Sequence, residues 1–242
     1  MKILAIGNSF SEDATVYLHR ILDAAGIDNT VVNLYIGGCS LERHWQNYEK
    51  RAAEYMYQLN GEHTERYVAI QDMLDEGGWD VITCQQASHD SGWVLTYEPF
   101  LGLLLEEIRR KAPASALWLH ETWAYEKDST HGNFMRYHRN REEMAGLVFE
   151  AYRAMAGKYG IKLIPCGEMI QALRNDPLFR FGSGRFPVCR DGFHLSMPYG
   201  RYAAAAMWAK KLCGVRMKDN AFLPPDADTE AVKAIRDCVD GF

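Results

Sequence analysis

The sequence lacks any long apolar stretch, because no hydrophobic run approaches the ~20 residues that a membrane-crossing helix needs. The opening residues 1–6 (MKILAI) are too short for the core of a secretory signal, and they run straight into Gly7. We therefore expect no membrane partner and, by default, a cytoplasmic location. A leader that had been removed from the chain would leave the same pattern.

The chain also lacks the short motifs that hold metals and nucleotides. Its six cysteines form no CxxC pair, and no His/Cys group has zinc spacing, so we predict neither a metal site nor a disulfide framework. The phosphate-binding patterns GxxxxGK[ST] and GxGxxG are both missing, and we expect no cofactor. The formal net charge of -5 gives no reason to expect nucleic acid as a partner.

What is present is typical of a globular α/β protein. The 242 residues, 48% of them hydrophobic, are enough for one large domain, which we place at residues 1–242. Short apolar segments alternate with helical patterns, which indicates a parallel sheet with right-handed crossovers. We expect strands at 2–6, 30–36, 80–85, 115–120 and 161–165, and helices at about 12–25, 41–52, 97–111, 136–159 and 198–213. Residues 54–69, with a tight turn at Asn60-Gly61, suggest a small added β-hairpin.

The residues that carry chemistry in such a fold lie where strands end, because ligands bind at the carboxyl edge of a parallel sheet. Ser9 follows the first strand and precedes a helix, whose N-terminus stabilises negative charge nearby. The alternative is that Ser9 or Ser11 only caps that helix. Asp191 and His194 stand three apart in a glycine-containing loop, a spacing that lets the carboxylate orient the imidazole. The alternative there is a surface loop with a capping aspartate.

Taken together, these blocks resemble the SGNH (GDSL-like) hydrolases. The resemblance rests on GNSFS at 7–11, a glycine after the second strand, a polar motif after the third strand, and DGFHLS at 191–196. It implies that Ser9 is the nucleophile, His194 the general base and then acid, and Asp191 its orienting partner. It also implies an oxyanion hole made by the backbone N–H groups of Ser9 and Gly38, in preference to Gly37, and by a side-chain amide from the third block.

Two departures from the family pattern affect this assignment. The first block has GNS where GDS is commoner, and the third has QQASH at 85–89 in place of GxND. QQASH is more similar to the QGES motif of the carbohydrate-esterase branch, and the chain resembles an uncharacterised bacterial subfamily with GNSFS and DGFHLS blocks. We assign the amide donor to Gln85, and Gln86 and His89 are the alternatives.

The resemblance implies a three-layer α/β/α sandwich around a five-stranded parallel sheet of flavodoxin-like order, with the small hairpin added. We expect a serine esterase acting on small O-acyl esters, with acetyl groups on carbohydrate favoured. The partner would then be a small-molecule or glycan ester, and His89, His120 and Trp123 are the candidate substrate-binding residues, although Trp123 could simply pack in the core. We interpret the other histidines, including His44 and His131, as surface or loop residues.

Two other functions fit the same scaffold. The altered third block suggests a non-catalytic glycan-binding module, and the expected sheet order is also that of flavodoxin-like phosphate or nucleotide binders. A serine-directed fluorophosphonate should label the esterase and not the glycan-binding module. Nucleotides should stabilise a nucleotide binder and not the esterase.

Overall fold

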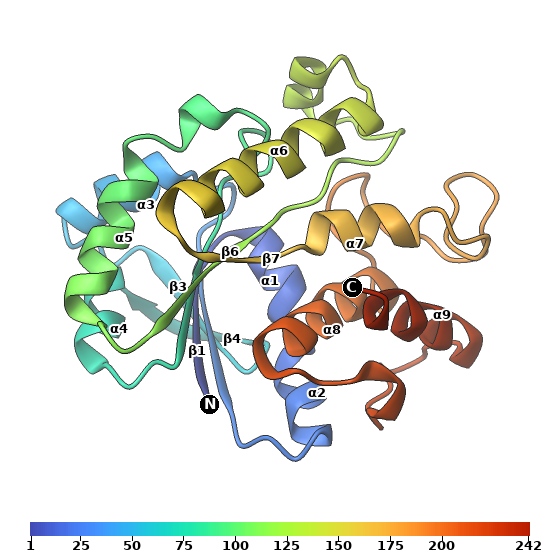
Figure 1. Cartoon of the computed structure of the whole chain (residues 1–242), viewed down its shortest axis with the longest axis horizontal. Helices are drawn as coiled ribbons and strands as arrows, with labels where there is room; N and C mark the ends of the chain where they lie inside the picture. The colour runs from blue at the N-terminus through green and yellow to red at the C-terminus, as the bar shows by residue number, and fades with distance from the viewer.

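In the computed structural model, which describes residues 1–242, seven strands form one mixed sheet in the order β4-β3-β2-β1-β5-β6-β7 (Figure 1). The strands are β1 (Lys2–Gly7), β2 (Thr30–Tyr35), β3 (Tyr55–Leu59), β4 (Glu62–Val68), β5 (Val81–Cys84), β6 (Ala116–His120) and β7 (Lys162–Ile164). The pairs among β2, β1, β5, β6 and β7 are all parallel. Their carboxyl ends therefore meet along one edge of the sheet, where the predicted site residues follow.

The central strand β1 is apolar along its whole length because both of its faces are covered. Ile3, Leu4, Ala5 and Ile6 are all buried, which explains a continuous hydrophobic run where a half-exposed strand would alternate. Ile3 pairs with Val31 of β2 on one side and with Val81 of β5 on the other. This register aligns the ends of three strands beside Gly7.

The predicted hairpin is confirmed, but it extends the main sheet. β3 pairs antiparallel with β2, and β4 pairs antiparallel with β3. The turn between them uses Asn60 and Gly61, both at positive φ (53° and 86°), as an Asn-Gly turn requires. The expected five-stranded parallel sheet is thus corrected to a seven-stranded mixed sheet, because the exposed edge of β2 pairs with the hairpin.

Helices cover both faces of the sheet (Figure 1). They are α1 (Ser9–Thr15), α2 (Leu18–Ala24), α3 (Leu41–Glu49), α4 (Ile70–Glu76), α5 (Phe100–Lys111), α6 (Arg141–Tyr159), α7 (Cys166–Leu173), α8 (Tyr199–Cys213) and α9 (Thr229–Asp240), with short 3-10 turns at Val94–Thr96, Gly132–Tyr137 and Met217–Asp219. α3, α4 and α5 contact one another on one side, and α1, α2, α7 and α9 gather around α8 on the other.

The helices differ from the prediction in two ways. The helix expected over 12–25 is two helices, because the chain turns between α1 and α2. α4, α7 and α9 were not predicted. The signals for α9 are present, since Asp228 accepts hydrogen bonds from the backbone N–H groups of Glu230 and Ala231, and one face of the helix buries Val232 and Ile235.

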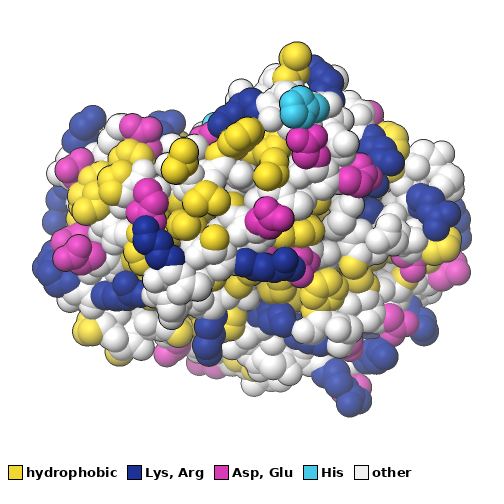
Figure 2. Space-filling model, turned by 45° about the horizontal axis from the view of Figure 1, so that its top comes forward, with side chains coloured by type: hydrophobic (Ala, Val, Ile, Leu, Met, Phe, Trp, Pro, Cys, Tyr) yellow, Lys and Arg dark blue, Asp and Glu magenta, His cyan; other side chains and the backbone are white.

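The surface is mixed in charge, as the small net charge leads one to expect. Figure 2 shows basic and acidic side chains interspersed with hydrophobic ones over the visible face. None of the helices combines the length and the apolar character that crossing a membrane would require.

Candidate active site

Ser9 is the first residue of α1, and only Asn8 separates it from the end of β1. The residue that caps the helix is Asn8, whose Oδ1 accepts the backbone N–H of Phe10 at 3.0 Å. Ser11 Oγ accepts the backbone N–H of Asn8 at 3.1 Å and so completes a capping box. Because Asn8 and Ser11 satisfy the helix terminus, the Ser9 hydroxyl is left for another partner.

That partner is His194. Its Nε2 lies 2.9 Å from Ser9 Oγ, and its Nδ1 lies 2.7 Å from Asp191 Oδ2. Asp191 Oδ1 also accepts the backbone N–H groups of Phe193 and His194, at 3.2 Å and 2.8 Å. Partial burial by itself would raise the Asp191 pKa, but these hydrogen bonds from His194 and Phe193 lower it below its usual value. An ionised carboxylate is therefore aligned behind the imidazole.

The turn between Asp191 and His194 depends on Gly192. Its φ is +83°, a conformation that favours glycine, and an added Cβ would lie 2.7 Å from the Cα of Ser129. The Gly192 carbonyl accepts the backbone N–H of Glu126 at 2.6 Å. This close packing against the segment after β6 fixes the tight turn that brings the side chains of Asp191 and His194 to one side.

Two backbone N–H groups, one in the segment of Ser9 and one in the segment that Asn8 contacts after β2, have no acceptor within the protein. The N–H of Ser9 lies at the start of α1, where no preceding turn can accept it, and that of Gly38 donates to no protein atom. Gly38 has φ +62°, and Asn8 Nδ2 donates to the carbonyl of the next residue, Cys39, at 3.0 Å. The strand ends thus present free donors of the kind that an oxyanion needs.

Of the three candidates in the third block, Gln85 is the one bonded to the segment of Ser9, through the neighbouring Asn8. Its side chain is 1% exposed, with Nε2 donating to Asn8 Oδ1 at 2.6 Å and Oε1 2.7 Å from His120 Nδ1. Gln86 is committed elsewhere, since its Oε1 accepts two backbone N–H groups and its Nε2 donates to Thr96. Gln85 has a second N–H to offer, and its assignment as the third oxyanion donor stays a prediction.

Two of the predicted substrate-binding residues are wrong for direct contact, because both are 0% exposed: His120 and Trp123. The Trp123 ring stacks on Phe10 with centroids 4.2 Å apart, and its Nε1 donates to the Phe193 carbonyl at 2.7 Å. Burial lowers the pKa of His120 to about 3, so this ring is neutral. Both side chains support the site from the protein interior: His120 is hydrogen-bonded to Gln85, and Trp123 is hydrogen-bonded to the loop of Phe193 and His194.

His89, the other predicted substrate residue, is half-buried and stacks with His131 at a centroid distance of 6.1 Å. The ring of His131 in turn packs edge-on against that of Phe193, with centroids 5.0 Å apart, and the ring centroids of Phe193 and His194 are 4.1 Å apart. Burial and the nearby charges of His89 and His194 lower the His131 pKa. The interpretation of His131 as an ordinary loop residue missed these contacts among the rings of His89, His131 and Phe193. The interpretation of His44 as a surface or loop residue was wrong, because His44 is completely buried and its ring is bonded to Tyr55.

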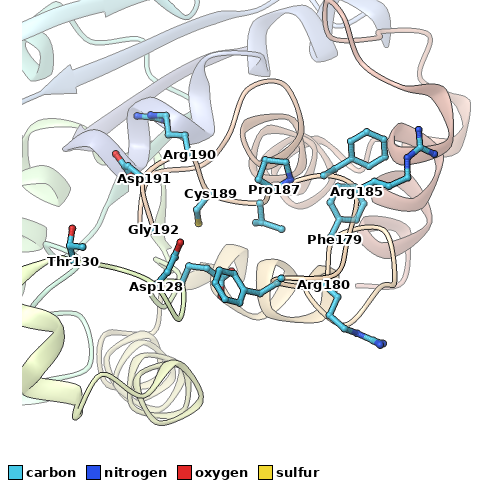
Figure 3. A pocket seen from close by; sticks show the side chains of 16 residues that line it. Asp128, Thr130, Phe179, Arg180, Arg185, Pro187, Cys189, Arg190, Asp191 and Gly192 are labelled. Atoms are coloured by element: carbon cyan, nitrogen blue, oxygen red, sulfur yellow. The ribbon is translucent and has the colours of Figure 1, made fainter.

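A cavity of about 440 Å³ opens beside the loop that carries Asp191 and His194. Its walls come from residues 126–130 and 179–192, and Asp191 and Gly192 belong to both the cavity and the loop. Figure 3 shows Asp128 on one side, with Pro187 and Cys189 opposite, and the Arg180 guanidinium turned outward. Sequence reasoning did not anticipate this cavity, because its walls are far apart in the chain. No group of three or more potential metal ligands comes together in the structure.

The comparisons with known proteins agree with this architecture. A DUF4886 family protein from Bacteroides uniformis ATCC 8492 is 37% identical, with a TM-score of 0.92 over 100% of this chain and 93% of that one. A proposed SGNH hydrolase from Slackia heliotrinireducens (21% identity, TM-score 0.61, 88% and 98% covered) and the acetyl xylan esterase AlAXEase (15%, 0.58, 86% and 98%) share the fold. No curated protein matches the chain.

The predicted resemblance is therefore confirmed at the level of the scaffold, which is that of the SGNH hydrolases. The family described as Domain of unknown function (DUF4886) matches residues 2–240, almost the whole sequence. This chain belongs to the DUF4886 family.

Proposed function

We propose that this protein is a serine esterase that hydrolyses small O-acyl esters, acetyl esters of carbohydrates in particular, through an acyl-enzyme. The observation that carries the proposal is the continuous hydrogen-bonded line from Ser9 Oγ through His194 to Asp191, with distances of 2.9 Å and 2.7 Å. The free N–H groups of Ser9 and Gly38 beside it add the second requirement of acyl transfer.

In the reaction that this arrangement supports, His194 Nε2 takes the proton of Ser9 as Oγ attacks the acyl carbon. The negative oxygen of the tetrahedral intermediate would accept the N–H groups of Ser9 and Gly38, and the second amide N–H of Gln85. The C–O bond to the alcohol then breaks, and His194 returns the proton to the leaving oxygen. Water, activated by the same imidazole, releases the acid and restores Ser9.

The cavity beside the loop supports carbohydrate as the alcohol part of the ester. It offers the rings of Phe181 and Phe186 together with the polar groups of Asp128 and Thr130, a combination that suits a sugar. The acetyl xylan esterase AlAXEase, which shares the fold, points to the same substrate class. We expect Asp128→Ala to raise KM for an acetylated oligosaccharide and to leave KM for a small aryl acetate unchanged.

The experiment that tests the function is fluorophosphonate labelling followed by peptide mapping. We expect a single adduct on Ser9, loss of labelling and of aryl acetate hydrolysis in Ser9→Ala, and retention of both in Ser40→Ala. Ser40 is a suitable control because its hydroxyl only caps α3. Hydrolysis that persists in Ser9→Ala would remove Ser9 from the nucleophile role.

The same measurements separate the two other functions. A non-catalytic glycan-binding module would bind acetylated glycans without turnover and without labelling. A phosphate or nucleotide binder would be stabilised against heat by nucleotides or flavin. No structural feature favours either one over the esterase.

A further inference from the structure

The segment that carries His194 and Asp191 has almost no regular structure of its own. Between Cys189 and Ser196 the only ladder contact is an isolated bridge from Cys189 to Leu195. A loop of this kind moves more readily than a helix or a strand unless other groups hold it. Proton transfer from Ser9 nevertheless needs the imidazole to stay within hydrogen-bond reach.

One buried carboxylate contacts the loop on both sides of the catalytic pair. Asp13, which is 0% exposed, accepts the backbone N–H of Leu195 through Oδ2 at 2.7 Å. Its Oδ1 lies 2.9 Å from Arg190 Nη1 and 2.7 Å from Arg201 Nε of α8. Arg190 immediately precedes Asp191, and Leu195 immediately follows His194. The Asp13 carboxylate therefore fixes the loop at its entry and at its exit.

A second buried carboxylate, that of Glu126, lies in another segment that contacts the loop. Glu126 lies between two arginines, with Oε1 2.5 Å from Arg141 Nη1 and Oε2 3.0 Å from Arg174 Nε. Its backbone N–H donates to the Gly192 carbonyl, and Arg174 Nη2 donates to Cys189 Sγ at 3.4 Å. Both carboxylates are thus paired with two guanidinium groups, but only Asp13 contacts the loop through the carboxylate itself.

Asp13 has a further property that Glu126 lacks, since it shares a helix with the nucleophile. Ser9 and Asp13 are four residues apart in α1, which places them on the same face one turn from each other. The geometry between the nucleophile and the carboxylate is therefore set by one rigid turn of helix. Burial raises the Asp13 pKa, and Arg201 and Arg190 oppose this, so the charged form depends on its two partners.

We propose that Asp13 is a positioning residue for the reaction: its carboxylate couples helix α1 to the 190–195 loop and so holds His194 Nε2 at bonding distance from Ser9 Oγ. The proposal rests on the esterase function for its kinetic consequence, but the geometry that it describes exists without substrate. Arg201 is the second member of the clamp, and its contact with the clamp is the one from Nε to Asp13 Oδ1.

The test is Asp13→Asn, which keeps the shape of the side chain and removes its charge. We expect kcat for aryl acetate hydrolysis to fall 10- to 100-fold with little change in KM, because the imidazole loses its alignment while the substrate surface is unaltered. The rate of fluorophosphonate labelling should fall by the same factor. Arg201→Lys, which keeps the charge and loses the planar donor group, should give a smaller loss of about 3- to 10-fold.

The matched control is Asp240→Asn. Asp240 is also a largely buried carboxylate that accepts two backbone N–H groups, those of Met217 and Lys218, and lies near a cation, Lys210. It joins the end of α9 to a different loop, so it reports the cost of losing such a carboxylate without touching the triad. We expect a comparable loss of thermal stability and an unchanged kcat.

A measurement without turnover keeps the proposal independent of the esterase assignment. In proton NMR, the Nδ1–H of His194 bonded to Asp191 should give a sharp downfield signal in the wild type that broadens or disappears in Asp13→Asn and in Arg201→Lys. A signal unchanged in folded Asp13→Asn, or a kcat that falls equally in Asp240→Asn, would overturn the clamp. If Asp13→Asn does not fold, Arg201→Lys decides alone. Absence of any wild-type esterase activity, with the signal still lost in the variants, would refute only the proposed function.

Discussion

The two halves of the candidate active site, that of Ser9 and that of the His194 imidazole, are built in different ways. The Ser9 half consists of a buried strand, a capping box and a helix, and the hydrogen bonds of the capping box join residues two or three positions apart. The imidazole half is a loop held by contacts such as that between Arg190 and Asp13, 177 positions apart. The comparison shows that the start of α1 is capped by its local sequence, whereas the loop of His194 also depends on charged residues far away in the chain.

The largest expected effect comes from the Ser9 half. Ser9→Ala should lower kcat/KM for an aryl acetate by a factor on the order of 10⁶, as for a lost triad nucleophile. The Ser9 hydroxyl bonds only to His194, so the melting temperature should stay within about 2 °C of the wild type. Activity assays and thermal unfolding of the same samples check both statements. Substantial loss of stability would mean that Ser9 has a structural role.

In the imidazole half, Asp191→Asn should lower kcat by about 10⁴-fold, because an amide cannot hold the imidazole in the required tautomer. The Oδ1 atom of the new asparagine can still accept the backbone N–H groups of Phe193 and His194, so the turn should remain. Pre-steady-state kinetics with an aryl acetate measure the loss in the acylation step. A decrease of less than tenfold would show that Asp191 only shapes the loop.

A smaller effect should separate the candidates of the third block. Gln85→Leu should reduce kcat by about 10²–10³-fold if this amide completes the oxyanion hole. Gln86→Leu provides the matched control: it removes hydrogen bonds to Leu41 and Thr96, which we expect to lower stability with little change in kcat. The reverse ranking of the two kcat values would transfer the role to Gln86.

The last expected effect lies outside the site, at Glu121 after β6, and it concerns stability and not the reaction rate. Burial raises the Glu121 pKa from 4.5 to about 8. At a pH between these two pKa values, Glu121 is ionised in the unfolded chain and protonated in the folded protein. The free energy of unfolding therefore falls as the pH rises from about 4.5 to about 8. A glutamine side chain at this position would not titrate. Glu121→Gln should therefore match the wild type near pH 4.5 and exceed it by about 3–5 kcal/mol at pH 8.

Denaturant unfolding at both pH values measures this difference. The carbonyl oxygen of the glutamine can keep the bond that Glu121 Oε1 accepts from the backbone N–H of Glu168 at the start of α7. Activity at neutral pH should be unchanged. Equal stabilisation at both pH values would show that packing, and not the proton, is responsible.

The features that could be predicted from the sequence are those encoded by short local patterns. The parallel strands and the Asn60-Gly61 turn follow from apolar runs and turn chemistry, and Ser9 follows from its place at a strand end. The sequence could not reveal the clamp, because an aspartate in a short helix and two distant arginines have no individual signature. Trp123 was misjudged for a related reason: an aromatic residue after a strand suits a binding loop or the core equally well, and only the stacking on Phe10 decides.

The asparagine in the first block has a consequence for how relatives of this chain can vary. Asn8 gives a hydrogen to Cys39 O and receives one from Gln85, which in turn receives one from His120. An aspartate would offer only acceptors, and the Cys39 carbonyl would then face a negative charge. The side chains at positions 8, 85 and 120 should therefore have changed together in evolution, so that GDS and GNS mark two alternative polar networks in homologous sequences.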